Sequence, residues 1–237
     1  MNPLKGKKVV VIGGSSGIGF AIAKAAAAEA AQVVISGRSA KRLEAALADI
    51  EQDVLIYPMD LTQEDSITDF FQREGDIDHL VISGSYVTSG TFYELPVEDA
   101  IRSMESKFWG PYRAVKAAKV RPGGSITLFS GVVSRRPTPG MVAIAAINAA
   151  VEGLGRALAV ELAPVRVNII SPGLVKTPAY KDMPDAQREA MYENAADSMP
   201  SRRVGEPEDI ASMALQIMTN PYLTGTIIDI DGGSLLV

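Results

Sequence analysis

The segment Gly13-Gly14-Ser15-Ser16-Gly17-Ile18-Gly19 combines residue types whose spacing suits dinucleotide binding. Gly13 permits a tight turn, Gly17 lets the backbone approach a pyrophosphate, and Gly19 lets a helix pack closely on a strand. The free N–H groups at the start of the following helix attract phosphate oxygens. Because the segment follows an apolar run and opens an Ala-rich helix, we predict a dinucleotide site rather than a plain strand-to-helix turn. The predicted contacts are Gly13, Ser15, Ser16, Gly17, Ile18 and Gly19.

The segment Ser36-Gly37-Arg38-Ser39 indicates which dinucleotide is bound. NAD-binding proteins commonly place an acidic residue at the end of the second strand, where it holds the ribose 2′-hydroxyl. This chain has no acid there, and Arg38 can instead form charge-assisted hydrogen bonds to a 2′-phosphate. We therefore predict that NADP(H) is favoured over NAD(H), with Arg38 and Ser39 as contacts. Lys41 and Arg42 either add to this positive field or are solvated charges on the next helix.

Seven short β-branched runs alternate with longer helical patterns along the chain. The predicted strands are 7–12, 31–36, 53–58, 79–83, 125–130, 165–170 and 226–231. The predicted helices are 17–30, 40–51, 63–74, 97–120, 141–163 and 207–219. Continuous apolar strands that alternate with helices predict an α/β fold, a Rossmann-type doubly wound parallel sheet of about seven strands. No change of composition marks a boundary, so we expect a single domain over residues 1–237.

A long irregular stretch interrupts the alternation after the sixth predicted strand. It contains several prolines and a short helical pattern at about 185–195. An excursion of this length from a compact sheet is usually functional. We predict that residues 174–204 form a substrate lid.

Composition and charge exclude several classes of function. The chain has no cysteine and one histidine, His79, which excludes disulfides, thiolate nucleophiles, Cys-ligated metals and multi-histidine metal sites. A net charge of −5 argues against nucleic acid or an anionic membrane as partner. The apolar run near the N-terminus is too short to span a membrane and leads into the glycine loop. We therefore expect a cytoplasmic protein that acts on a small molecule and holds no metal.

These spacings resemble the short-chain dehydrogenase/reductase family over essentially the whole chain. Asp60-Leu61 resembles the family's adenine-contacting pair, and Ser83-Gly84 falls in its segment after the fourth strand. The segment 168–177 resembles the family's N-x-x-x-P-G-x-x-x-T motif, and TGTIIDIDGG resembles its last strand and turn. The resemblance implies an NADP(H) site and a homodimer or homotetramer assembled through helices 97–120 and 141–163. It adds these cofactor contacts: Asp60, Leu61, Ser83, Gly84, Asn148, Pro172, Gly173, Val175 and Thr177.

The four catalytic positions of that family carry other residues here. Its asparagine corresponds to Lys107 in KFWG, its serine to Gly131, its tyrosine to Ile144 and its lysine to Asn148. The family's tyrosine exchanges a proton with the carbonyl oxygen, which isoleucine cannot do. No tyrosine occurs between residues 112 and 180, so no shift of the alignment restores the motif. An active enzyme must take its proton from another group.

The asparagine and the lysine of the motif are exchanged in this chain. By resemblance, both side chains face one small volume, so Lys107 would bring its amine near the place of the missing lysine while Asn148 hydrogen-bonds the ribose. Ser130, which precedes Gly131, would bond a substrate oxygen, or it merely ends a buried strand. We predict Lys107, Ser130 and Asn148 as the catalytic candidates. The alternative is that Lys107 is an ordinary exposed lysine.

Three further residues are candidates for contact with the substrate. Tyr86 follows the fourth predicted strand and Tyr180 lies in the predicted lid, so both phenols could line the cleft. Arg135 could bind a carboxylate or stabilise an oxyanion. An arginine in such a loop is otherwise a solvated or subunit-contact residue.

Three functions are compatible with this sequence. The first is an NADP(H)-dependent oxidoreductase acting on a small carbonyl or alcohol with non-standard acid/base residues. The second is a catalytically silent NADP(H)-binding sensor or partner subunit. The third is a non-redox enzyme, an isomerase or cyclase, that reuses the pocket.

Overall fold

The computed structural model describes residues 2–237 and contains a seven-stranded parallel sheet in the order β3-β2-β1-β4-β5-β6-β7. The strands are β1 Lys8–Ile12, β2 Gln32–Gly37, β3 Val54–Pro58, β4 Asp76–Ile82, β5 Lys119–Phe129, β6 Arg166–Pro172 and β7 Ile227–Ile230. Each observed strand overlaps a predicted one, and every neighbouring pair is parallel. The predicted single doubly wound domain is confirmed.

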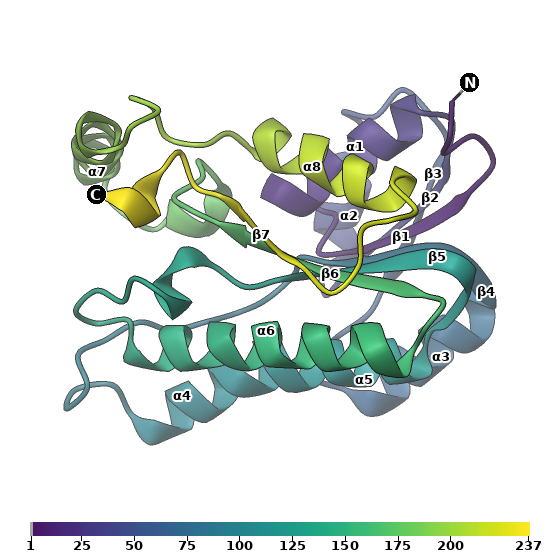
Figure 1. The fold of residues 1–237 in the computed structure, drawn as a ribbon, viewed down its shortest axis with the longest axis horizontal. Coiled ribbons are helices and arrows are strands. Elements are labelled where there is room, and N and C mark those ends of the chain that lie inside the picture. Colours follow the sequence, from purple (N-terminus) through teal and green to yellow (C-terminus); the bar gives the residue numbers. More distant parts are fainter. Residues whose placement is uncertain (1) are drawn as a thin grey trace.

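Helices cover both faces of the sheet (Figure 1). They are α1 Gly17–Ala28, α2 Ala40–Leu47, α3 Glu64–Glu74, α4 Val97–Met104, α5 Gly110–Ala117, α6 Val142–Glu161, α7 Asp185–Ser198 and α8 Pro207–Thr219. Short turns of 3₁₀ helix lie at Val132–Ser134, Pro178–Tyr180 and Ser234–Leu236. Helices α1, α2 and α8 lie on one face, and α3, α4, α5 and α6 lie on the other. The sequence 97–120, predicted as one helix, is α4, a π-helical turn at Glu105–Trp109, α5, and the first residues of β5.

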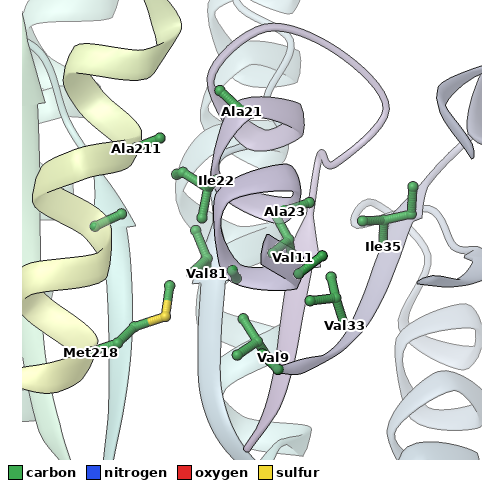
Figure 2. Close-up of a cluster of buried hydrophobic side chains, with 14 of the residues drawn as sticks. Val9, Val11, Ala21, Ile22, Ala23, Val33, Ile35, Val81, Ala211 and Met218 are labelled. Atoms are coloured by element: carbon green, nitrogen blue, oxygen red, sulfur yellow. The ribbon is translucent and has the colours of Figure 1, made fainter. Parts of the chain in front are cut away.

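Two apolar cores hold these layers together. Figure 2 shows the first, in which Ile22 of α1 points toward Val81 of β4 and Ala23 lies beside Val11 of β1. Met218 of α8 approaches from the side. The second core lies on the other face around Phe70 and Leu80, both fully buried. Each face of the sheet is apolar, which explains why the strands read as unbroken apolar runs.

The order of the strands determines where a ligand can bind. The chain continues from β1 outward to β2 and β3, and then crosses to β4 on the opposite side of β1. This reversal opens a crevice beyond the carboxyl ends of β1 and β4, where ligands of doubly wound sheets bind. The loops after β1, β4, β5 and β6 all begin at this edge.

Helix α6 is long and apolar enough by composition to cross a membrane, with a mean hydropathy of 1.4. In this fold it packs along β5 and β6, and its Val151 lies in the second core. Its apolar composition thus partly reflects a helix that covers the sheet.

Candidate functional site

The glycine loop and the loop after β4 touch each other through their backbones. A Cβ atom on Gly13 would collide with the backbone of Gly84, and one on Gly19 would collide with the carbonyl of Gly13 and the hydroxyl of Ser83. Gly13 also has φ +86°, a conformation that favours glycine. Ser83 and Gly84 are held in place because both N–H groups donate to Ile12 O, at 3.0 and 3.1 Å. Glycine is therefore required where these two loops meet.

The N-terminus of α1 fits a phosphate group. Ser16 is the N-cap residue, and its side chain makes no capping hydrogen bond, so the first N–H groups of α1 have no side-chain acceptor. Gly17 has φ +54°, and a Cβ there would lie 3.3 Å from Cβ of Thr177. Thr177 therefore covers the glycine loop from the segment after β6, as expected if both contact one ligand. Ser15 and Ile18 lie in the same loop, and Ile18 packs partly into the core.

The predicted adenosine side of the site lies after β2 and β3. Arg38 is exposed directly after β2, and Ser39 caps α2 by accepting a hydrogen bond from Arg42 N–H at 3.4 Å. Asp60 Oδ1 accepts from the N–H and the hydroxyl of Thr62, at 2.9 and 2.8 Å. Arg38 is thus available to a ligand, whereas the side chains of Ser39 and Asp60 already have partners within the chain.

The segment after β6 is placed by packing. Pro172 ends β6, Gly173 lies against Asp231, where a Cβ would stand 2.8 Å from its Cα, and Val175 is 5 % exposed. Val175 also pairs with Gly205 in an isolated bridge. The side chain of Val175 therefore belongs to the core.

Lys107 points into the protein rather than into solvent. It lies in the π-helical turn between α4 and α5, and its Nζ donates a hydrogen bond to Ser130 O, at the end of β5, at 3.1 Å. Burial lowers the pKa of Lys107 from its ordinary 10.5 to about 8. An ammonium group with this pKa can give up a proton near neutral pH.

The π-helical turn has a local cause in the sequence. Gly110 N–H donates to Glu105 O, five residues earlier, and the next residue, Pro111, has no N–H to continue an α-helix. A Cβ on Gly110 would lie 2.9 Å from Leu61 O, so glycine allows the helix to approach the loop after β3. Pro111 lines the same small cavity as Lys107. The Gly110-Pro111 pair therefore shapes the turn that carries the lysine.

Asn148 meets the segment after β5 from the opposite side. Its Nδ2 lies 3.4 Å from Gly131 O, to which it donates, and 3.0 Å from where a Cβ of Gly131 would stand. A serine at 131 would therefore press against Asn148. Lys107 and Asn148 thus donate to consecutive carbonyls, those of Ser130 and Gly131.

Two buried polar atoms at this place lack partners among residues 2–237, namely Ser130 Oγ and Asn148 Oδ1. Ser130 is 4 % exposed and Asn148 is 1 % exposed. Leaving buried polar atoms unpaired costs about 1–3 kcal/mol each. Both atoms are available to accept a hydrogen bond from a ligand, and a ribose hydroxyl would fit Asn148 Oδ1. The site therefore fits a dinucleotide at both its phosphate and its ribose end.

The substrate candidates lie in three different settings. Tyr86 is half-exposed, and its N–H donates to Ser106 Oγ at 2.8 Å, which places it next to the turn that carries Lys107. Burial raises the pKa of Tyr180, whose ring packs edge-on against Tyr192, so it is a poor acid. Arg135 forms an ion pair with Asp229 and donates to Ser171 Oγ at 2.8 Å. The structure thus gives Arg135 partners within the chain.

Sequence reasoning missed Glu152 and Ser134. Glu152 lies one turn after Asn148 on α6, is 6 % exposed, and its Oε1 lies 2.6 Å from Ser134 Oγ. The i, i+4 spacing of an acid from Asn148 was the available signal, because it places both side chains on one face of the helix.

Comparisons with known proteins identify the family of this chain. A family model described as "Enoyl-(Acyl carrier protein) reductase" matches residues 12–234. The short-chain dehydrogenase/reductase ucsE of Acremonium sp. is 33 % identical, over 98 % of this chain and 97 % of that protein. The structure of a small-chain dehydrogenase in complex with NADPH is 38 % identical with a TM-score of 0.83, and covers 98 % of this chain and 100 % of its own. The structure of the MalC reductase/Diels-Alderase of Malbranchea aurantiaca is 30 % identical with a TM-score of 0.92, and the match covers 100 % of this chain and 99 % of that one. This chain belongs to the short-chain dehydrogenase/reductase family.

Proposed function

We propose that this protein is an NADP(H)-dependent reductase of small carbonyl compounds in which Lys107 replaces the tyrosine as proton donor. Membership of an oxidoreductase family supports the general kind of reaction, and the NADPH complex of a relative supports a nicotinamide cofactor. The observation that carries the proposal is the buried Lys107 amine, which is hydrogen-bonded to Ser130 O at the sheet edge and has a pKa of about 8.

NADPH, when bound, would supply the hydride to the carbonyl carbon. The Lys107 ammonium has three N–H donors, and Ser130 O accepts one of them, so two remain for a substrate oxygen. As the carbonyl oxygen gains negative charge, Lys107 donates its proton and becomes a neutral amine, which solvent then protonates again. Ser130 Oγ orients the same oxygen, and Asn148 Oδ1 accepts a hydrogen bond from a ribose hydroxyl.

The residues proposed to hold the cofactor are those of the predicted set that the structure leaves available. Gly17 and the N–H groups that begin α1 would bind the pyrophosphate, Arg38 a 2′-phosphate, and Thr177 would cover the phosphates from the lid side. Residues 174–204, which contain α7, would act as the substrate lid. Tyr86 is the phenol best placed to contact the substrate, because it lies beside the Lys107 turn.

Kinetics of Lys107→Met test this proposal. We expect kcat for carbonyl reduction to fall on the order of 100-fold or more, as for the loss of a general acid. The Kd for NADPH, read from dihydronicotinamide fluorescence, should change little. In the unsubstituted enzyme kcat should fall as pH rises through about 8, because the ammonium form is the donor.

Lys116→Met is the matched control, because Lys116 is exposed on α5, two turns further along. It should leave kcat and its pH dependence unchanged. If Lys107→Met reduced carbonyls at the full rate, Lys107 would not be the acid. Tight NADPH binding with no turnover across a broad carbonyl panel would favour the silent sensor instead.

A second candidate function is cyclisation. It is favoured by the likeness to a protein described as a reductase/Diels-Alderase, whose structure superposes with a TM-score of 0.92. In that reaction Lys107 would hydrogen-bond a carbonyl of the substrate without transferring hydride. Mass spectrometry separates the two, because a reduced product is two mass units heavier than its substrate, whereas a cyclised isomer has the same mass.

We also propose a homodimer or homotetramer. Val97, Ile101, Trp109 and Tyr112 are exposed apolar residues of α4, the π-helical turn and α5. Proteins of this family are typically oligomeric and act on small molecules, and a second copy of the chain would cover this surface.

A further inference from the structure

Glu152 is a buried acid that the proposed reaction does not use. It is 6 % exposed and lies on α6, on the same face as Asn148. Its hydrogen-bond partner is the hydroxyl of Ser134, at 2.6 Å, and its charge attracts the guanidinium of Arg135, which itself pairs with Asp229. Acidic side chains are rarely this buried unless a partner compensates for the lost hydration. The position of Glu152 therefore needs an explanation beyond packing.

Ser134 connects Glu152 to the two carbonyls of the candidate site. Its hydroxyl lies 3.0 Å from Gly131 O and its N–H donates to the same oxygen at 3.1 Å. Gly131 O also accepts from Asn148 Nδ2, and the carbonyl just before it holds Lys107. A shift of the turn at 131–134 would therefore displace both Asn148 and Lys107.

The turn at 131–134 is also linked to the sheet. Arg135, the next residue, forms an ion pair with Asp229 of β7 and donates to Ser171 Oγ of β6 at 2.8 Å. The turn is thus attached to α6 through Ser134 and to the sheet through Arg135. Two side-chain hydrogen bonds join the turn to α6: the long one from Asn148 Nδ2 to Gly131 O, at 3.4 Å, and the shorter one from Ser134 Oγ to Glu152, at 2.6 Å.

We propose that Glu152 is a positioning residue, which holds Ser134 and thereby fixes the carbonyls of Ser130 and Gly131 where they orient Lys107 and Asn148. The inference rests on the proposed function, because it gives Glu152 a role in that same site. Glu152 itself touches neither substrate nor cofactor.

Four variants test the proposal: Glu152→Leu, Ser134→Ala, their combination, and Glu152→Gln. Glu152→Leu and Ser134→Ala should each lower kcat on the order of 10- to 100-fold, because both release the turn. The double variant should lose no more than either single variant, because the two residues act through one hydrogen bond. Glu152→Gln keeps an acceptor for the Ser134 hydroxyl and should stay near the original rate. Glu161→Gln, at the exposed end of α6, is the control.

A second readout does not depend on turnover. In protein labelled with ¹³C-lysine, the ¹³Cε shift of Lys107, assigned through Lys107→Arg, reports its ionisation. We expect a pKa of about 8 in the original protein and a rise toward 10.5 in Glu152→Leu and Ser134→Ala, because the released ammonium regains water. NADPH binding should persist in all variants.

The outcomes are distinguishable. Additive losses in the double variant, losses that follow a falling Tm, or an unchanged Lys107 pKa in both single variants would overturn the role of Glu152. An original protein without turnover but with these pKa shifts would overturn the proposed function and leave the positioning role in place.

Discussion

At the scale of single residues, the site combines a lysine and an asparagine whose places in the family motif are exchanged. Lys107 and Asn148 each stand where the other's type is expected, yet both reach the same pair of carbonyls, at 130 and 131. The third change fits the first two, because Gly131 leaves the space in which Asn148 Nδ2 lies. Gly131 and Asn148 are therefore matched to each other in packing.

Arg38 allows a test of cofactor choice. Replacing the exposed guanidinium with a carboxylate, Arg38→Asp, removes its charge-assisted bonds to a 2′-phosphate and adds repulsion. We expect the Kd for NADPH to rise about 10- to 100-fold. The Kd for NADH should change much less. Titration of both nucleotides by fluorescence measures this, with Arg156→Ala, at an exposed arginine of α6, as control. Equal losses for the two nucleotides would contradict the prediction.

Residues whose role depends on local backbone conformation could be predicted, whereas residues whose role depends on a partner far away in the chain could not. The glycines were found because their roles depend on local backbone shape, and the Lys107 hypothesis came from a resemblance in spacing. Arg135 was considered for substrate binding, but its ion pair with Asp229 joins positions far apart in the chain. Nothing local to Arg135 indicates that partner, and the available signal for Glu152 was its i, i+4 spacing from Asn148.

At the scale of elements, the π-helical turn carries Lys107 at the sheet edge. An extra residue in one turn rotates the side chains that precede it relative to those that follow. From this turn Lys107 donates to Ser130 O at the sheet edge, while Trp109, two residues on, is partly exposed. The sequence pattern predicted one helix over 97–120 and missed the break, although Gly110-Pro111 was its visible signal.

Pro111→Ala tests the turn. Alanine supplies an N–H that can donate to the carbonyl of Lys107, so a regular α-helix becomes about 3 kcal/mol more favourable locally. We expect kcat to fall at least about tenfold as Lys107 leaves its position, while NADPH binding persists and Tm does not fall. Pro207→Ala, at the first residue of α8, is the control, because proline costs a helix little there. An unchanged kcat would show that the turn does not depend on Pro111.

At the scale of the whole molecule, the fold was predictable and the assembly is open to test. The seven strands and their parallel arrangement could be predicted from the apolar runs, because strands that are buried on both faces are apolar throughout. Light scattering should give a mass two or four times the 25.1 kDa of the chain. Ile101→Glu places a charge on the exposed apolar surface of α4 and should shift the mass toward the monomer. Tyr222→Glu, at a residue that is 98 % exposed elsewhere, should leave it unchanged.

The buried ammonium of Lys107 also has a consequence for thermodynamic stability. Its pKa is about 8 in the folded chain against an ordinary 10.5, so between these values the unfolded chain binds the extra proton. The free energy of unfolding should therefore rise with pH from about 8 to about 10.5, and below pH 8 the cost is constant at about 3 kcal/mol. Urea unfolding at several pH values should show Lys107→Met more stable than the original protein at pH 7, with the difference shrinking above pH 8. Lys107 would then lower the free energy of unfolding while it serves as the proton donor.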